Sequence, residues 1–126
     1  MSNYSNDWGK QAEQLAADYL TANGYPIRER NWSPAHGHKE IDIITSKEKR
    51  IIFVEVKARS GRDQDPIDAI TAAKLRNLYR CAESYLKSLP EDWWEYQFDI
   101  IAITGNITDY RIEHIKDAFL GPLRTY

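Results

Sequence analysis

Apolar residues recur with the period of a helix in two stretches of the chain. The first helical pattern covers residues 9–23, and its apolar face is made of Ala12, Leu15, Ala16, Tyr19 and Leu20. The Gly and Pro that follow it predict its end. The second pattern covers residues 67–89 and lies between Pro66 and Pro90. Helices of this length are marginal alone, so both apolar faces are expected to pack on something else.

The other apolar stretches have the composition and length of β-strands. They are residues 27–32, 40–44, 51–58, 97–103 and a short one at 111–115, after which residues 115–119 predict a terminal helical turn. The polar residues 46–50 predict an antiparallel hairpin between the second and third strands. Residues 97–103 are almost continuously apolar, which is typical of a central strand covered on both faces. The predicted fold is therefore α/β, one sheet flanked by helices with an αβββαβ core, in one domain over residues 1–126.

The strand over 51–58 contains two charges in an otherwise apolar run. Side chains alternate along a strand, so Glu55 and Lys57 share a face with Phe53, while Val54 points the other way. Charges within a strand that is apolar on both faces need partners or a function. Asp42 stands among isoleucines on the neighbouring strand, and the predicted hairpin allows it to converge with Glu55.

Two adjacent carboxylates and a lysine suit a metal-dependent hydrolase. Two carboxylates about 4 Å apart repel by about 4 kcal/mol at an effective dielectric constant near 20, and a divalent cation relieves this repulsion. A small set of oxygen ligands with open positions favours Mg²⁺ or Mn²⁺ over zinc. Lys57 would then orient a water molecule or neutralise charge on a phosphate. The alternative is a Glu55–Lys57 pair at the end of a sheet, partly exposed to solvent.

Composition narrows the classes of function. The chain has 126 residues, a net charge of −2 and one cysteine, which excludes an intramolecular disulfide framework and a cysteine-rich zinc site. No apolar run is long enough to cross a bilayer, and the N-terminus lacks a signal-peptide pattern, so we expect a cytoplasmic protein without membrane partners. Residues 24–89 carry 13 Lys and Arg against 9 Asp and Glu, so this segment retains a capacity to face phosphates.

The sequence resembles the YraN-like family of uncharacterised bacterial proteins over residues 9–119. The matching residues are Gly9 with Glu13, Ala16 and Tyr19-Leu20; Gly24-Tyr25; Asn31-Trp32; Glu40-Ile41-Asp42; Phe53-Val54-Glu55-Val56-Lys57 with Arg59; Lys74; Ala82 with Tyr85-Leu86; Phe98-Asp99; and His114-Ile115 with Ala118-Phe119. The order and spacing of these residues make the match far more specific than the Glu-x-Lys tripeptide alone.

The resemblance implies a restriction-endonuclease-like fold, related to archaeal Holliday-junction resolvases. It implies that Asp42 and Glu55 bind Mg²⁺ or Mn²⁺, that Lys57 orients water, and that Glu13 on the first helix joins the catalytic set. Lys39 stands where the family usually has glycine, and the loop over residues 33–38 also departs from the family pattern. These departures affect the approach of substrate rather than the proposed ligands.

Further residues are candidates for binding or structural roles. Lys74 lies within the apolar face of the second helix, where it either extends along the surface or contacts a phosphate or the carboxylates. Lys39 and Arg59 are further candidates for nucleic-acid contacts. Asp99 is expected to make a structural hydrogen bond, and Trp93-Trp94 belongs to a core lid, a base-stacking platform or a homodimer interface.

Three functions from different classes therefore follow from the sequence. The first is a metal-dependent nuclease that hydrolyses phosphodiester bonds of DNA, branched DNA included. The second is a nucleic-acid-binding module that keeps the fold without cleaving. The third is an interaction protein in DNA processing.

Overall fold

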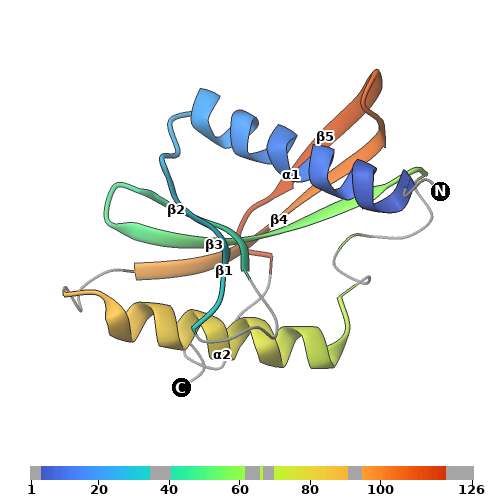
Figure 1. Cartoon of the computed structure of the whole chain (residues 1–126). Coiled ribbons are helices and arrows are strands. Elements are labelled where there is room, and N and C mark those ends of the chain that lie inside the picture. The colour runs from blue at the N-terminus through green and yellow to red at the C-terminus, as the bar shows by residue number, and fades with distance from the viewer. Residues whose placement is uncertain (1–3, 35–40, 62–65, 67–69, 91–94, 119–126) are drawn as a thin grey trace.

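The computed structural model describes residues 4–34, 41–61, 66, 70–90 and 95–118 (Figure 1). Its elements are α1 (Tyr4–Ala22), β1 (Ile27–Trp32), β2 (Ile41–Lys47), β3 (Arg50–Arg59), α2 (Ala72–Ser88), β4 (Glu95–Asn106) and β5 (Asp109–Ile115). The α/β class and the order of elements agree with the sequence prediction. In the part of the chain covered by these ranges, no helix is both long and apolar enough to cross a membrane.

The five strands form one mixed sheet in the order β1-β2-β3-β4-β5. Only β3 and β4 are parallel, and the other three pairings are antiparallel. The predicted hairpin between β2 and β3 is confirmed, with Lys47 opposite Arg50. A parallel pair needs a long crossover, and the segment that contains α2 supplies it.

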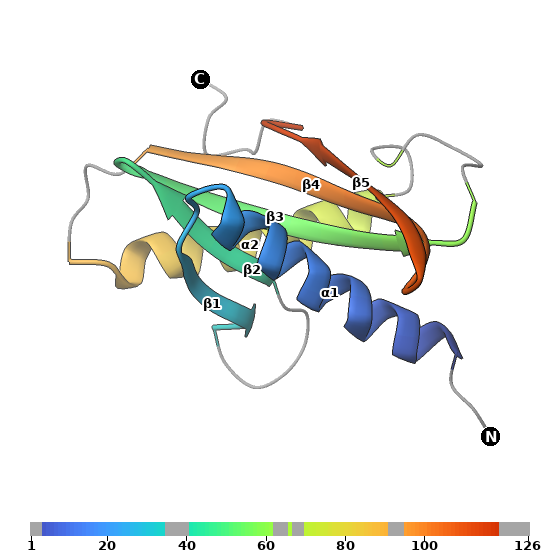
Figure 2. The ribbon, with the colours of Figure 1, turned by 90° about the horizontal axis from the view of Figure 1, so that it is seen from above.

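The two helices cover opposite faces of the sheet, so the molecule has three layers (Figures 1 and 2). The alternation along β3 separates two cores: Ile52 and Val54 pack with α1, whereas Ile51 and Phe53 pack with α2. As predicted, β4 is buried on both faces, from Gln97 to Ile103. Glu55 and Lys57 therefore belong to the face that α2 covers.

The boundaries of the helices differ from the prediction. The second helix begins at Ala72 rather than at residue 67, because Thr71 is an N-cap whose side chain accepts a hydrogen bond from the Lys74 amide at 3.1 Å. The first helix begins earlier, at Tyr4, and its extra turn lets the Trp8 indole donate to the Arg59 carbonyl at 3.3 Å. At the C-terminal end, residues 116–117 form a turn, and residue 119 lies outside the described residues.

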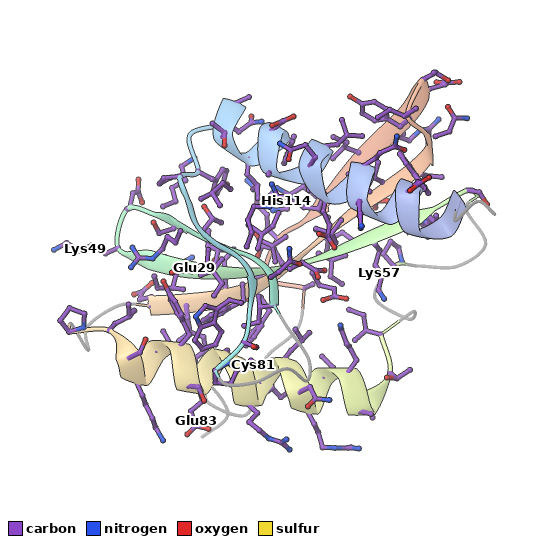
Figure 3. All side chains as sticks on the ribbon, viewed as in Figure 1. Glu29, Lys49, Lys57, Cys81, Glu83 and His114 are labelled. Atoms are coloured by element: carbon purple, nitrogen blue, oxygen red, sulfur yellow. The ribbon has the colours of Figure 1, made fainter. Side chains whose placement is uncertain are left out.

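A buried network on the α1 side of the sheet confirms the structural interpretation of Asp99. One Asp99 oxygen lies 2.7 Å from His114 Nε2, and the other accepts from the Gln97 side chain and the Asp117 amide. The Tyr19 hydroxyl lies 3.0 Å from His114 Nδ1. The network joins α1, β4 and β5, and Figure 3 shows His114 between α1 and the sheet.

Gly105, which pairs with Tyr110 near the end of β4, should tolerate an added methyl group poorly. Gly105 has φ +125°, and a Cβ there would collide with the Asp109 carbonyl oxygen. We expect Gly105→Ala to lower the free energy of unfolding by about 1–3 kcal/mol because the backbone must move to a strained conformation. Urea denaturation followed by circular dichroism measures this change.

Gly9→Ala is the matched control. Gly9 lies inside α1, and a Cβ there would meet no atom within 4 Å. Alanine should raise the free energy of unfolding by up to about 1 kcal/mol, since glycine is unfavourable within a helix. Equal effects of the two substitutions would contradict the assignment of strain to Gly105.

Candidate metal and phosphate site

The candidate site lies where β2 separates from β3. The pairing of these strands ends at Ile43 and Val54, whereas β3 continues beside β4 as far as Arg59. At the point of separation, Asp42 Oδ2 accepts a hydrogen bond from the Val56 amide at 2.9 Å. The Asp42 side chain thus occupies the position that a backbone carbonyl of β2 would take in a continuing ladder, which holds its carboxylate beside Glu55.

Glu55 is the buried centre of the site. Its exposed fraction is 4%, and its Oε2 lies 3.7 Å from Lys57 Nζ and 3.5 Å from Lys74 Nζ. Lys57 precedes the end of β3, and Lys74 comes from the first turn of α2. We call Asp42, Glu55, Lys57 and Lys74 the carboxylate–lysine cluster. Figure 3 shows Lys57 far along β3 from Lys49, which lies at the hairpin end.

One oxygen of the cluster is left without a hydrogen bond. Both lysines approach Glu55 Oε2, and among the described atoms Glu55 Oε1 is buried with no hydrogen-bond partner. Such an atom normally costs about 1–3 kcal/mol, so it calls for an explanation. A bound cation, or a group that donates a hydrogen bond, would satisfy Glu55 Oε1.

The raised pKa values of the two carboxyl groups also favour a bound cation. Burial, followed by the negative charge of Asp42, raises the pKa of Glu55 from 4.5 to about 7. Burial also raises the pKa of Asp42, although its bond from the Val56 amide and the charge of Lys74 oppose this rise. Each carboxylate is thus expensive to ionise, and a positive charge placed between the two would make ionisation easier.

The residues present fit a hard divalent cation. Mg²⁺ is commonly held by one or two carboxylates, with water and substrate phosphates completing the shell, and Asp42 with Glu55 can supply two. In the ranges that the structure describes, no group of three His, Cys, Asp or Glu residues is placed to hold a metal. The donor set therefore suits a cation that keeps open positions rather than a closed structural site.

The other predicted residues stand as follows. Glu13 is half-buried on α1, which packs on the opposite face from α2, and its participation stays a prediction. Arg59 lies two residues beyond Lys57, and its guanidinium bonds to Thr104 at 3.0 Å and approaches Glu113 at 3.9 Å. Lys39 lies outside the described residues, as do Glu40, His36, His38 and Trp93-Trp94.

Sequence reasoning found three members of the cluster and left the fourth open. Lys74 had two interpretations, and the contact with Glu55 supports the one in which it is a partner of the carboxylates. The bond between Asp42 and the Val56 amide was missed. Nothing in the sequence marks it, because it depends on where two strands separate rather than on residue type.

Glu55 should make the stability of the cation-free protein depend on pH. Its pKa is raised in the folded state, so the folded protein keeps a proton that the unfolded chain releases between pH 4.5 and about 7. This proton stabilises the fold fully below pH 4.5, and the contribution is lost as the pH rises through 7. One pKa unit corresponds to about 1.4 kcal/mol, so the loss can reach about 3 kcal/mol.

Glu55→Gln should remove that dependence. In EDTA, the free energy of unfolding of the variant relative to the wild type should increase between pH 5 and pH 8.5, as measured by urea denaturation. Glu83→Gln is the control, because Glu83 lies on the outer side of α2 with Lys87 as its partner at 3.4 Å (Figure 3). Parallel pH profiles for the wild type and Glu55→Gln would contradict the raised pKa.

The chain is similar to proteins of one described family. Residues 12–103 match the family described as "Uncharacterised protein family UPF0102". A UPF0102 protein of Bacteroides fragilis is 45% identical over 116 residues, which cover 91% of this chain and 93% of that protein. One of Bacteroides thetaiotaomicron is 41% identical over 94% of this chain and 96% of its own length. One of Chlorobium chlorochromatii is 41% identical over 93% and 94%, respectively. Asp42, Glu55, Lys57 and Lys74 all fall within the matched residues, and the chain belongs to the UPF0102 family.

Proposed function

We propose that this protein is a divalent-cation-dependent nuclease with a restriction-endonuclease-like fold, which hydrolyses phosphodiester bonds of DNA in the cytoplasm. The observation that carries the proposal is the buried Glu55 Oε1 beside Asp42 at the separation of β2 and β3, which has no hydrogen-bond partner among the residues that the structure describes. The order of elements supports it, because the strand that carries Asp42 and the strand that carries Glu55 and Lys57 form the hairpin at the centre of the αβββαβ core.

In this proposal Asp42, Glu55 and Lys57 have separate roles. Asp42 and Glu55 would hold Mg²⁺ or Mn²⁺, which supplies Lewis acidity and lowers the pKa of a bound water molecule. Lys57, which is 30% exposed, places its ammonium group between the buried carboxylate and solvent, where it can orient the attacking water. Asp42 is itself held by the Val56 amide, so its position does not depend on the substrate.

Positive groups near the cluster suit a phosphate backbone. Lys74 and Lys57 stand on the same side of the sheet, and Arg59 follows along β3. Ammonium and guanidinium groups bind phosphates through charge-assisted hydrogen bonds and stabilise charge that develops during phosphoryl transfer. The net charge of −2 for the whole chain does not prevent this, because the cations are local to the site.

A non-catalytic nucleic-acid-binding module is the second candidate function. The observation that favours it is that both lysines are already paired with Glu55, so the cluster carries no net charge when both carboxylates are ionised. Such a module would bind DNA with an affinity that falls with salt concentration, and it would release no cleavage products.

A cleavage assay tests the proposal. Duplex, nicked, flapped and four-way DNA, together with RNA of the same sequences, are incubated with the purified protein in Mg²⁺ or Mn²⁺. We expect cleavage of at least one DNA substrate, abolished by EDTA. Binding without products in any cation would favour the second candidate.

Asp42→Asn, Glu55→Gln and Lys57→Met should each lower the cleavage rate by about 10²–10³-fold, the size typical of a lost catalytic group. Glu83→Gln and Lys87→Met change the same charges on the outer side of α2 and should keep the wild-type rate. Thermal denaturation of each variant shows whether it is folded. Full activity in folded Glu55→Gln would contradict the site.

A further inference from the structure

Lys74 differs from the other cationic residues of α2 in what its side chain contacts. Arg76, Arg80 and Lys87 are exposed, and Lys87 pairs with Glu83 on its own helix. Lys74 is only 25% exposed, and its ammonium group crosses to the sheet, where it lies 3.5 Å from Glu55 Oε2. Its contact is thus with the buried centre of the site rather than with the surface.

Lys74 is fixed at the base of its side chain and extended at the tip. Its amide donates to Thr71 at the N-cap of α2, so its Cα is held at the first turn of the helix. Four methylene groups lead from there to the ammonium group, which has three donors and no fixed geometry. Rotation about the bonds of this side chain can move the charge away from Glu55 Oε2.

The charges of the cluster show when that movement becomes favourable. Two ionised carboxylates and two lysines balance, so the cation-free cluster has no excess charge for a phosphate. Both lysines contact Oε2, whereas Oε1, which has no hydrogen-bond partner in the described ranges, is the oxygen left for a ligand. A divalent cation on the carboxylates gives the cluster an excess of two positive charges, and it repels the ammonium groups from Glu55.

We infer that Lys74 is a cation-responsive positioning residue: it pairs with Glu55 in the cation-free protein, and it turns to a phosphate of the nucleic acid when Asp42 and Glu55 hold a divalent cation. This inference rests on the proposed function. It adds that the cation controls binding of the nucleic acid as well as its cleavage. It also means that Lys74 competes with the cation for Glu55.

Two binding measurements at pH 8 on the full chain test this role. The first is Mn²⁺ binding, followed by the electron paramagnetic resonance signal of free Mn²⁺. The second is binding of a fluorescein-labelled four-way DNA junction, followed by anisotropy in EDTA and in Ca²⁺, which takes the same oxygen ligands. Neither measurement requires cleavage.

Lys74→Met should bind Mn²⁺ about tenfold more tightly than the wild type, because one competing positive charge is removed. Its affinity for the junction should be nearly that of the wild type in EDTA, and about fivefold weaker in Ca²⁺, where a phosphate contact is lost. Lys74→Arg should keep the dependence on Ca²⁺. Lys87→Met, the matched control, should change junction binding equally in EDTA and Ca²⁺, and should leave Mn²⁺ affinity unchanged.

The failures are distinguishable. If the wild type binds no Mn²⁺, or if Asp42→Asn and Glu55→Gln bind it as well as the wild type, the proposed metal site is wrong and the inference falls with it. If those variants lose Mn²⁺ while Lys74→Met does not gain affinity, only the role of Lys74 is overturned. An equal loss of junction binding by Lys74→Met in EDTA and Ca²⁺ would make Lys74 an ordinary phosphate contact. Lys74→Gln repeats the test if the methionine variant does not fold.

Discussion

The hydrogen bond from the Val56 amide to Asp42 is the interaction on which the site depends. It forms where β2 leaves β3, and it lets a side chain satisfy a backbone donor that a continuing strand would have paired. The same bond carries the Asp42 carboxylate to the neighbourhood of Glu55 and offsets part of the cost of its burial. If β2 stayed paired with β3, a backbone carbonyl of β2 would accept from the Val56 amide, and the Asp42 side chain would not be its acceptor.

Where β2 and β3 separate, Glu55 is buried beside Asp42. Glu55 is 4% exposed, lies near Asp42, and pairs with two lysines through one oxygen. Its burial and the charge of Asp42 make its ionisation costly, and a divalent cation would lower this cost. The rest of the fold supplies a rigid support. Phe53 and Ile51 anchor the same face of β3 to α2, and the Asp99–His114 pair ties β4 to β5 on the other face. The cluster therefore stands on packed strands and a helix rather than on a loop, which is what precise positioning of ligands requires.

Much of the fold could be predicted from the sequence, and each error has a local cause. The hairpin of β2 and β3 follows from the short polar stretch between two apolar ones, and the burial of β4 follows from its almost continuous apolar run. The alternation of side chains along β3 separated Glu55 from Val54 correctly. The start of α2 was placed too early because the apolar pattern continues through Thr71, whereas the Thr71 side chain caps the helix at that point. The extra turn at the start of α1 was missed because Trp8 finds its partner, the Arg59 carbonyl, 51 residues away in the sequence.

The sequence by itself determined which residues are candidates for a metal and phosphate site: Asp42, Glu55 and Lys57 are charges within apolar strands, and charges there need partners or a function. It also determined that Glu55 and Lys57 share a face, since side chains alternate along any strand. Only the tertiary structure decided that Asp42 bonds to Val56, that Lys74 reaches Glu55 from a separate helix, and that one oxygen of Glu55 has no hydrogen-bond partner among the described atoms. These facts depend on where a strand ends and how a helix packs on the sheet, and neither is encoded in the local period of the chain.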